Sequence, residues 1–421
     1  MRQKKNFIVL VLLLLPLLLS ACNRASNDTA GTDGHMIAVG PDGTENGAGG
    51  GGGLEEIEHV EYDVYLGDPI PEQVQETEIE ESESVPDLGG RPTPVRYAGG
   101  LELPVNGATG FAPVSLLVHA TNSQNSSVVA ILAPGSVFVV LKEEGEWWYI
   151  EEGGGTGWVL HRYCFINLPD VVPSIVYDIT NTYASAFVSS GIAIPFVTGQ
   201  ALYQGRSFNG RLGRDEFIAP ILYATARRIY VAQQAALAEG NTLVVYEAFR
   251  PLFVQQLVSN NLSLLVESNQ AVYDGINQAP WHIGWFIADG VSSHQMGWAI
   301  DVTLARVNWK EEVTVGNYLV TRITGYTEYS MPTAIHDLSA GAAVFTTPLS
   351  YSDRHAWRNA AFTSTMTESA ILLHWYMVGA GLFPLASEWW HFNDLDAGYA
   401  LGGNASQGNF VLGMVHSRTP H

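Results

Sequence analysis

Basic residues and long apolar runs are both scarce in this chain. Its 421 residues include 20 Lys and Arg against 42 Asp and Glu, which gives a net charge of −22. A chain so poor in basic residues offers no patch for a phosphate backbone, and a nucleic-acid partner is therefore not expected. Hydrophobic residues make up 47% of the sequence and charged residues only 15%. The chain can thus bury more than one core and is not disordered overall.

An apolar run does stand near the start of the chain. A positively charged beginning precedes residues 7–19, a run too short to span a bilayer comfortably, which is typical of a secretory signal. The following "LSAC", residues 19–22, resembles the lipobox of bacterial lipoproteins. This resemblance implies a signal peptide over residues 1–22 and a diacylated Cys22. A plain signal peptide, or an uncleaved anchor with an incidental cysteine, is the alternative.

Cysteine is the scarcest residue type of all. The chain has only Cys22 and Cys164, so lipidation of the first leaves the second without a partner for an intramolecular disulfide. Stability outside the cell must then come from packing or from a metal ion, because no cystine bridge is available.

Residues 23–95 have the composition of a tether. They are rich in Gly, Ser, Thr and acidic residues, and residues 54–88 hold 13 Asp or Glu with no Lys or Arg. Gly-rich chain is flexible and self-repelling acidic chain is extended, so the segment can hold folded domains away from a membrane. A docking role for the acidic run, residues 75–84, is the alternative to a solvated spacer.

Residues 105–169 have the pattern of a small all-β barrel. Short alternating apolar segments such as "SVFVVLK" and "EWWYIEE" are separated by Asn, Ser and Pro-Gly turns at intervals of about ten residues. The order of these segments, ending in "GWV" at residues 157–159, resembles bacterial SH3-like domains. The resemblance implies a module that binds cell-wall peptide or packs beside a catalytic domain.

Residues 170–421 predict a larger α+β domain. Helical spacing of apolar residues spans residues 214–240 and 367–381, and strand patterns occupy residues 242–249, 298–304 and 388–392. Strands and helices do not alternate regularly, which favours α+β over a βαβ repeat.

A histidine and a carboxylate lie close together in "SSHQMGWAIDVTL". Strand alternation puts Asp301 on the face opposite Ile300, where a charge is costly unless something pairs with it. Gly297 permits the sharp loop that returns His294 to its side. An imidazole and a carboxylate together suit zinc. The alternative is an ordinary loop histidine and an ordinary strand carboxylate.

The segment "SEWWHFN" supplies the missing pieces of a catalytic zinc site. His391 offers a third ligand, and Glu388, three residues earlier, offers a carboxylate close to the metal that is free to act as a base. Three protein ligands leave one open position for water, and the metal lowers the pKa of that water and polarises a carbonyl.

Arg250 ends an apolar strand in "YEAFRP". Its guanidinium is placed either to stabilise a tetrahedral oxyanion or to hold a substrate carboxylate.

Together these segments resemble the zinc D-alanyl-D-alanine dipeptidases of the VanX type, which are relatives of the D-alanyl-D-alanine carboxypeptidases and of the hedgehog fold. That family carries S-x-H-x-x-G-x-A-x-D, whose fixed positions are filled here by Ser292, His294, Gly297, Ala299 and Asp301. Three separated motifs in the family's order make chance agreement improbable.

The other two motifs agree with the same family. The family's E-x-x-H reads EWWH in the dipeptidases and EPWH in the carboxypeptidases, and residues 388–391 read EWWH. Its Y-R-P segment is matched by Phe249, Arg250 and Pro251, with Phe in place of Tyr. The resemblance implies a hedgehog-like domain with one zinc ion per chain, a general base and a transition-state arginine. The residues implied are the zinc ligands His294, Asp301 and His391, the base Glu388, the arginine Arg250, and Ser292 at the substrate.

One departure concerns the substrate. The family's M-G-T-x-F-D holds an aspartate that contacts the free amine of the dipeptide, whereas residues 331–337 read MPTAIHD. His336 stands at the aspartate's place and Asp337 follows it, so both are candidate substrate-binding residues. A longer peptide is therefore compatible with this site.

The sequence thus predicts a zinc metallopeptidase that cleaves D-Ala-D-Ala or a related cell-wall peptide. It is expected to sit lipid-anchored on the outer face of the cell membrane, with the SH3-like domain contacting peptidoglycan. A carboxypeptidase or endopeptidase acting on peptidoglycan stem peptides is one alternative. An inactive wall-binding lipoprotein is another, although a base beside an intact ligand set argues against it.

Overall fold

The computed structural model describes residues 93–420, which belong to one compact unit. The predicted signal peptide, the lipidation site Cys22 and the tether up to residue 92 lie outside the described residues. Within the described part, no helix has the length and apolar character needed to cross a membrane. Cys164 is buried and unpaired there.

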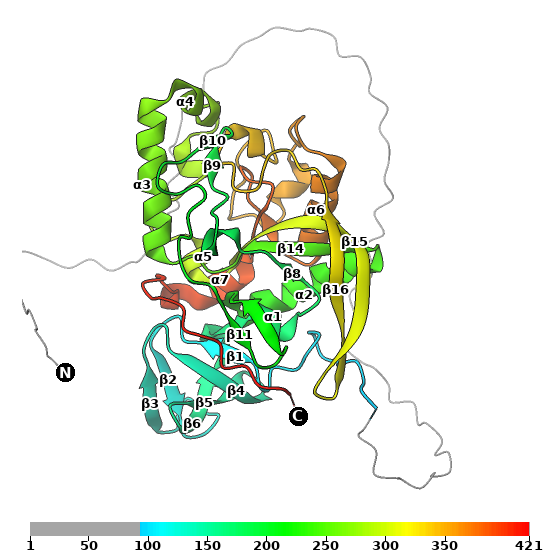
Figure 1. The fold of residues 1–421 in the computed structure, drawn as a ribbon. Helices are drawn as coiled ribbons and strands as arrows, with labels where there is room; N and C mark the ends of the chain where they lie inside the picture. The colour runs from blue at the N-terminus through cyan, green and yellow to red at the C-terminus, as the bar shows by residue number, and fades with distance from the viewer. Residues whose placement is uncertain (1–92, 421) are drawn as a thin grey trace, which may run out of the picture. The chain divides into compact units, whose positions relative to one another are not determined.

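A sheet-rich region occupies the stretch for which a small barrel is predicted. Seven of its strands follow one another along the chain, and an eighth, β13, joins from the following domain to give the order β13-β7-β1-β4-β5-β6-β2-β3 (Figure 1). Trp148 is fully buried in this region and fills its core. The strands are β1 Thr109–Phe111, β2 Leu116–His119, β3 Val128–Leu132, β4 Val137–Glu144, β5 Trp147–Glu152, β6 Gly155–Leu160, β7 Phe165–Asn167 and β13 Pro220–Leu222.

The helix predicted over residues 214–240 is wrong in its first part. Helix α2, Tyr223–Ala238, begins nine residues later, because β12, Arg214–Phe217, pairs with β11, Arg206–Asn209, and β13 pairs with β7. Pro220 has no N–H to donate within a helix. The buried residues around Pro220 therefore extend the first sheet as strand β13 and do not form the start of a helix.

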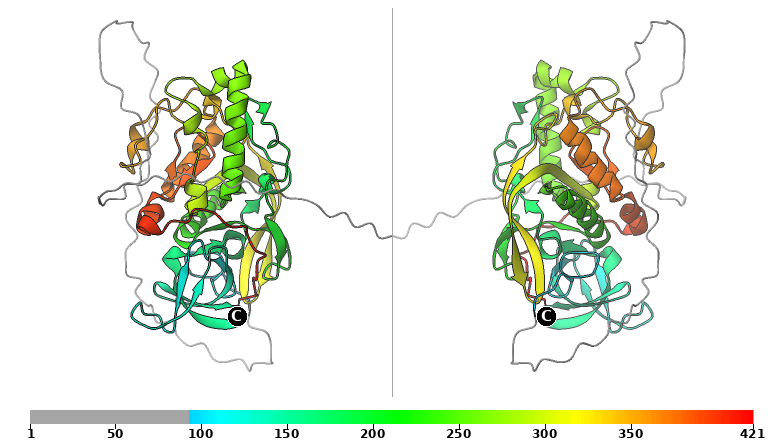
Figure 2. Two further views of the ribbon diagram at one scale, coloured as in Figure 1. Left: turned by 90° about the vertical axis from the view of Figure 1, so that its left-hand side faces the viewer. Right: turned by 90° about the vertical axis from the view of Figure 1, so that its right-hand side faces the viewer.

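A six-stranded sheet forms the centre of the larger domain. Its order is β17-β18-β15-β14-β8, with β16 also paired to β15, and all pairs except β14 with β8 are antiparallel. Strand β15 is far longer than the predicted residues 298–304, because its outer half leaves the core and forms an exposed two-stranded ribbon with β16 (Figure 2). The strands are β8 Val176–Tyr177, β14 Asn241–Glu247, β15 Ala299–Val315, β16 Tyr318–Glu328, β17 Phe383–Pro384 and β18 His391–Asn393; two more, β9 Val188–Ser189 and β10 Ile192–Ala193, form a separate hairpin.

Helices cover this sheet and flank the site. Helix α2 packs on β14 and α6, and α6 also packs on β15 and β17. Thr367 caps α6 by accepting a hydrogen bond from the backbone N–H of Ala370, close to the start predicted at residue 367. The remaining helices are α1 Leu168–Val171, α3 Leu252–Ser268, α4 Gln270–Ile276, α5 Ser293–Met296, α6 Glu368–Gly379 and α7 Leu395–Leu401.

The two regions are joined by more than the chain connection. The last residues of the chain return to the first sheet, where Arg418 pairs with Glu151 and the backbone N–H of His416 donates to the Thr109 hydroxyl. One hydrophobic cluster contains residues of both regions, from Trp148 to Trp390. The described residues are therefore a single packed body, although the sequence divides them at residues 169 and 170.

Candidate metal centre

His294 is delivered by a single helical turn. Ser292 caps helix α5 in a reciprocal arrangement with Gln295, and Gly297 ends the helix with a φ of +77°. A Cβ on Gly297 would lie 2.1 Å from the ring of Phe165. Only glycine fits both the left-handed backbone and the close approach. The sequence therefore fixes the turn that aims His294 at the sheet.

Sheet register places three charged or ligating side chains in one row. Asp301 of β15 is paired with His391 of β18 on one side and with Glu247 of β14 on the other. Neighbours paired across adjacent strands point to the same face of a sheet. All three side chains are buried, so each needs a polar or charged partner.

The donor atoms of His294, Asp301 and His391 converge on one point. His294 Nε2 lies 3.1 Å from His391 Nδ1 and 3.3 Å from Asp301 Oδ2, and His391 Nδ1 lies 3.0 Å from Asp301 Oδ1. Tetrahedral zinc with bonds of about 2.1 Å separates its ligand atoms by about 3.4 Å. The separations and the donor types therefore fit a zinc ion, as the two imidazoles and the carboxylate form one possible metal-binding group.

Hydrogen bonds fix which ring nitrogen of each histidine faces the centre. His294 Nδ1 lies 2.8 Å from the carbonyl oxygen of Ala248, so Nδ1 donates and the lone pair is on Nε2. His391 Nε2 lies 3.0 Å from Asn393 Oδ1, which leaves the lone pair on Nδ1. Such outer hydrogen bonds set the tautomer and orientation of a metal-ligating imidazole.

Burial and charge oppose each other at these side chains. Burial alone would raise the pKa of Asp301, but its interactions with the neighbouring imidazoles, that of His294 first and then those of His336 and His391, hold it well below its usual range. Burial lowers the pKa of His294. An ionised carboxylate beside neutral imidazoles is the protonation state in which these groups bind a metal ion.

Glu388 lies beside this cluster and is buried. Its Oε2 is 3.8 Å from His391 Nδ1, and Leu385 and His391 bracket it through backbone hydrogen bonds. Burial, followed by the negative charge of Asp301, raises the pKa of Glu388 well above its usual range. A carboxyl group with a raised pKa next to a metal-ligand cluster is suited to accept and return a proton.

Arg250 is buried and its guanidinium is held by three partners. Its Nε donates to Glu247 at 2.6 Å, its Nη1 donates to Gln255 at 2.7 Å, and its Nη2 lies 3.3 Å from Asp301. Burial would lower the pKa of Arg250, but Glu247 and Asp301 raise it. Arg250 is predicted to bind an oxyanion or a substrate carboxylate. Its hydrogen bonds to Glu247 and Asp301 compete with either role.

The three predicted substrate-binding residues have other partners. The Ser292 hydroxyl caps α5. His336 is fully buried, stacks on Phe187, and has its Nε2 3.1 Å from Asp301 Oδ2. The Asp337 carboxylate accepts from the backbone N–H groups of Ser190 and Gly191. Their substrate contacts remain predictions.

Glu247 is the main site residue that the sequence reasoning missed. It accepts hydrogen bonds from Asn181 Nδ2 and Tyr203 Oη in addition to Arg250. One feature of the sequence could have revealed it: Glu247 is a charged residue at the end of the apolar strand in "YEAFRP". Glu247, Asp301 and His336 form a second possible metal-binding group, but the guanidinium of Arg250 already occupies the space between its carboxylates.

Comparison with known families agrees with the division of the chain. No curated protein matches it. Residues 115–164 match the model described as bacterial SH3 domain, and residues 218–402 match the peptidase M15 model, described as D-ala-D-ala dipeptidase. The second match contains every residue of the cluster and supports a metallopeptidase that acts on D-Ala-D-Ala-like peptides. The chain therefore contains a region that matches the peptidase M15 family model, preceded by a region that matches the bacterial SH3 domain model.

Proposed function

We propose that this protein is a zinc-dependent peptidase that hydrolyses D-alanyl-D-alanine or a closely related cell-wall peptide. The observation that carries the proposal is that His294 Nε2 and His391 Nδ1 lie 3.1 Å apart and each faces one oxygen of Asp301, at 3.3 and 3.0 Å, beside a buried Glu388. These three residues would hold one zinc ion per chain. The ion, when bound, supplies Lewis acidity toward the scissile carbonyl and toward a water molecule.

Glu388 is the residue that moves the proton in this proposal. Its carboxylate is next to the ligand cluster and is not itself one of the three convergent ligands. It accepts a proton from the attacking water and returns that proton to the leaving amine, so that the peptide bond is replaced by a carboxylate and a free amine. Burial keeps competing water away from this carboxyl group.

Arg250 and Glu247 position the carboxylate of Asp301. The guanidinium spans Glu247 and Asp301, so it holds Asp301 in place and adds a fixed positive charge beside the reacting carbonyl. In this proposal Arg250 acts on the transition state through its fixed charge, because its Nη2 atom already contacts both Glu247 and Asp301.

A specific observation favours the alternative substrate, a longer stem peptide. The carboxylate that would hold a free substrate amine is absent at His336, whose ring is engaged by Asp301, and Asp337 is engaged by two backbone N–H groups. Neither side chain is free to select a dipeptide by its amine. We therefore propose carboxypeptidase or endopeptidase activity on peptidoglycan stems as the second candidate, and the hedgehog-like fold as the architecture common to both.

We also propose where the protein is located and what it contacts. A lipid anchor on Cys22 would hold the enzyme at the outer face of the cell membrane, and the SH3 region would contact peptidoglycan. Metabolic labelling with a fatty-acid analogue tests the anchor, since label should be lost in Cys22→Ala. Pull-down by purified peptidoglycan tests the wall contact.

The substrate experiment compares two peptides under one condition. Purified protein is incubated with D-Ala-D-Ala and with an N-acylated peptide ending in D-Ala-D-Ala, with and without a chelator, and released D-Ala is measured. Chelator-sensitive release from the dipeptide supports the first candidate, and release from the acylated peptide alone supports the second. Release that a chelator leaves unchanged refutes both.

A further inference from the structure

Two hollows adjoin the ribbon formed by β15 and β16, and no residue of the metal cluster lines either of them. The first has a volume of about 370 Å³ and is walled by Leu212, Val313, Val315 and Val320. The second, of about 420 Å³, lies among β8, β12 and β16. Pro173, Arg214 and Arg322 line both hollows, so they stand where the two meet.

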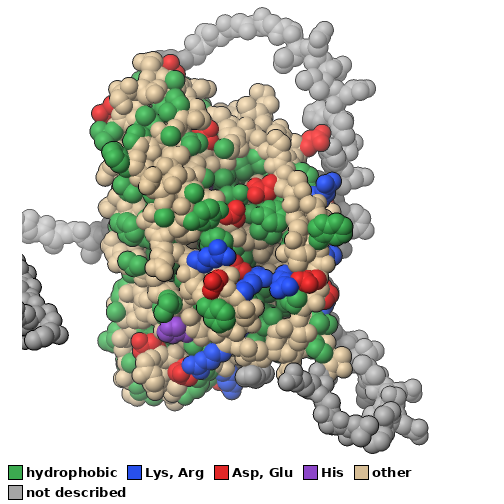
Figure 3. Space-filling model, viewed as in Figure 1, with side chains coloured by type: hydrophobic (Ala, Val, Ile, Leu, Met, Phe, Trp, Pro, Cys, Tyr) green, Lys and Arg blue, Asp and Glu red, His purple; other side chains and the backbone are tan. Residues whose placement is uncertain are grey.

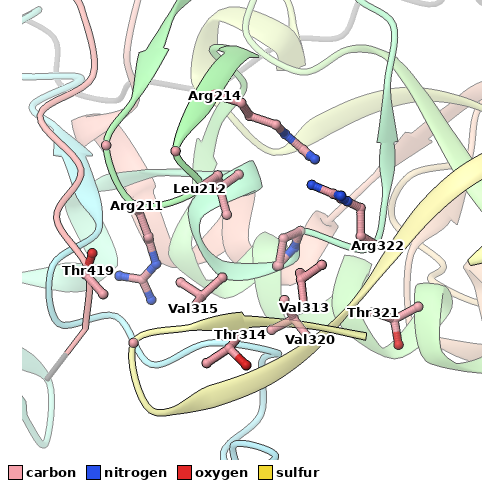
Figure 4. Close-up of a pocket in the computed structure, with 14 residues that line it drawn as sticks. Arg211, Leu212, Arg214, Val313, Thr314, Val315, Val320, Thr321, Arg322 and Thr419 are labelled. Atoms are coloured by element: carbon pink, nitrogen blue, oxygen red, sulfur yellow. The ribbon is translucent and has the colours of Figure 1, made fainter. Parts of the chain in front are cut away.

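Three arginines gather at this place in a chain that is otherwise acidic. Figure 4 shows the guanidinium groups of Arg214 and Arg322 pointing toward each other across the first hollow, with Arg211 below Leu212. Lys and Arg side chains also gather near the middle of the face in Figure 3, beside a hollow in the surface. Two cations that point at each other repel, and here each guanidinium has one carboxylate beside it, Glu216 for Arg214 and Glu311 for Arg322.

Arg211 is a buried cation that makes no direct ion pair with a carboxylate of the described residues. It is 3% exposed, and it donates from Nη1 and Nη2 to the carbonyl oxygens of Asn106 and Pro104. Its Nε has no partner, and it forms no ion pair with any carboxylate of the described residues. Burial lowers its pKa to about 10, which still leaves it charged at neutral pH. The negative charge of Asp170 partly offsets this cation, but without a direct ion pair a buried charge is unfavourable.

Arg214 and Arg322 each retain donor capacity. Arg214 contacts Glu216 through Nε and Nη2, and Arg322 contacts Glu311 through the same two nitrogens. Among the described residues, none accepts a hydrogen bond from Nη1 of either arginine. Both side chains are partly exposed, at 35% and 42%, so a ligand can reach them.

The walls of the hollows favour a peptide over a free inorganic anion. The second hollow is lined by apolar residues such as Ile175 and Ile323 and also by polar ones, Glu216 among them, so it offers surfaces to both the apolar and the polar parts of a peptide. Strand β8 is the last strand of its sheet, and β12 pairs only with β11. Outer strands offer backbone groups that an extended peptide can pair with.

We propose that the junction of the two hollows binds the carboxylate groups of an extended acidic peptide, with Arg214 and Arg322 as the clamp and Arg211 as a fixed charge beneath. A guanidinium pairs with a carboxylate through two parallel hydrogen bonds, which gives the site its preference. This site is separate from the metal cluster and does not depend on the proposed peptidase activity.

The test is a calorimetric titration of the full-length protein with triglutamate blocked at both ends, at low ionic strength. Binding by the wild type and an affinity at least about tenfold lower in Arg214→Gln/Arg322→Gln support the site. Arg214→Lys/Arg322→Lys keeps the charges but loses the planar fork, so it should bind with intermediate affinity. Equal affinity in the Gln double variant places the peptide elsewhere and overturns the proposal.

Two controls separate the site from general charge effects. Arg306 is exposed on β15 and lines neither hollow, so Arg306→Gln should bind triglutamate as the wild type does. Blocked triglutamine should not bind, and its binding with the affinity of triglutamate would overturn the carboxylate assignment. Inorganic phosphate that binds more tightly than triglutamate would overturn the assignment to a peptide.

Discussion

The Nε2 atom of His336 lies 3.1 Å from the Oδ2 atom of Asp301. The contact is made by a residue with a φ of +60°, a conformation that residues other than glycine seldom adopt. His336 is held there by stacking on Phe187 and by its backbone carbonyl, which accepts from Val188. The surroundings thus fix a costly backbone conformation that brings the ring to the central carboxylate.

Replacing His336 by Phe should weaken zinc binding by about tenfold or more, because a group that orients a ligating carboxylate commonly contributes that much. The Phe ring retains the stack and removes only the contact to Asp301. Zinc affinity is measured by competition with a chromophoric chelator. His374→Phe is the matched control, since His374 is equally buried and neither of its ring nitrogens has a partner among the described residues. Unchanged zinc affinity with a raised KM in His336→Phe would instead assign His336 to the substrate.

Replacing Glu247 by Gln should lower the free energy of unfolding by about 3 kcal/mol, because it removes one side of a buried ion pair with Arg250. Chemical denaturation at neutral pH measures this change. Glu312→Gln, which breaks the exposed pair with Arg96, should cost less than about 1 kcal/mol. Similar small losses in both variants would show that Arg250 does not depend on Glu247.

Replacing Gly297 by Ala should both destabilise the fold and reduce its zinc content. The added Cβ would meet the ring of Phe165 at 2.1 Å in a left-handed backbone, which together cost about 2 kcal/mol or more and displace His294. Thermal unfolding and metal analysis measure the two effects. Gly290→Ala adds a Cβ with no atom within 4 Å and should change neither property. A wild-type zinc content in Gly297→Ala would contradict the account of the turn.

Stability should decrease as the pH rises from about 5 to about 7. Burial raises the pKa of Glu102 to about 7 from an ordinary value of 4.5, although Ser174 and Gln234 donate hydrogen bonds to it. Between these two values the folded protein holds a proton that the unfolded chain has lost, so unfolding becomes easier with rising pH. The expected loss is about 1–3 kcal/mol and is complete above pH 7.

Denaturation curves across this pH range measure the contribution of Glu102. Glu102→Gln cannot ionise at this position and should therefore lose less stability between pH 5 and pH 8 than the wild type. Glu146→Gln, a change at an exposed position, should keep the wild-type pH dependence. A slope in Glu102→Gln that equals the wild-type slope would contradict the assignment.

Local features of the fold follow from the sequence more readily than pairings between distant segments. The helix after Thr367 and the turn at Gly297 depend on caps and on glycine, which are visible within a few residues. The extra strand β13 depends on β7, which lies far earlier in the chain, whereas β15 and β16 pair through the short turn that joins them. The helical spacing of apolar residues in 214–222 says nothing about the partner strand β7. The helix predicted for these residues is therefore wrong, and they form β12 and β13 instead.

The metal centre shows the same contrast between short local motifs and contacts that depend on distant segments. The spacing of His294 and Asp301, and of Glu388 and His391, indicates chemistry because each motif is short. Glu247 enters the site only through the register that sets it beside Asp301, and register between strands is not encoded in either strand alone. The engagement of His336 by Asp301, instead of by a substrate amine, likewise required the positions of both segments.

The central claim is tested most directly by measuring zinc content and D-Ala release on the same preparations of three proteins. We predict one zinc ion per chain and turnover in the wild type, retained zinc with turnover at least about a hundredfold lower in Glu388→Gln, and loss of both in His391→Ala. Wild-type turnover in Glu388→Gln, or turnover by a wild-type protein that holds no zinc, would contradict the account.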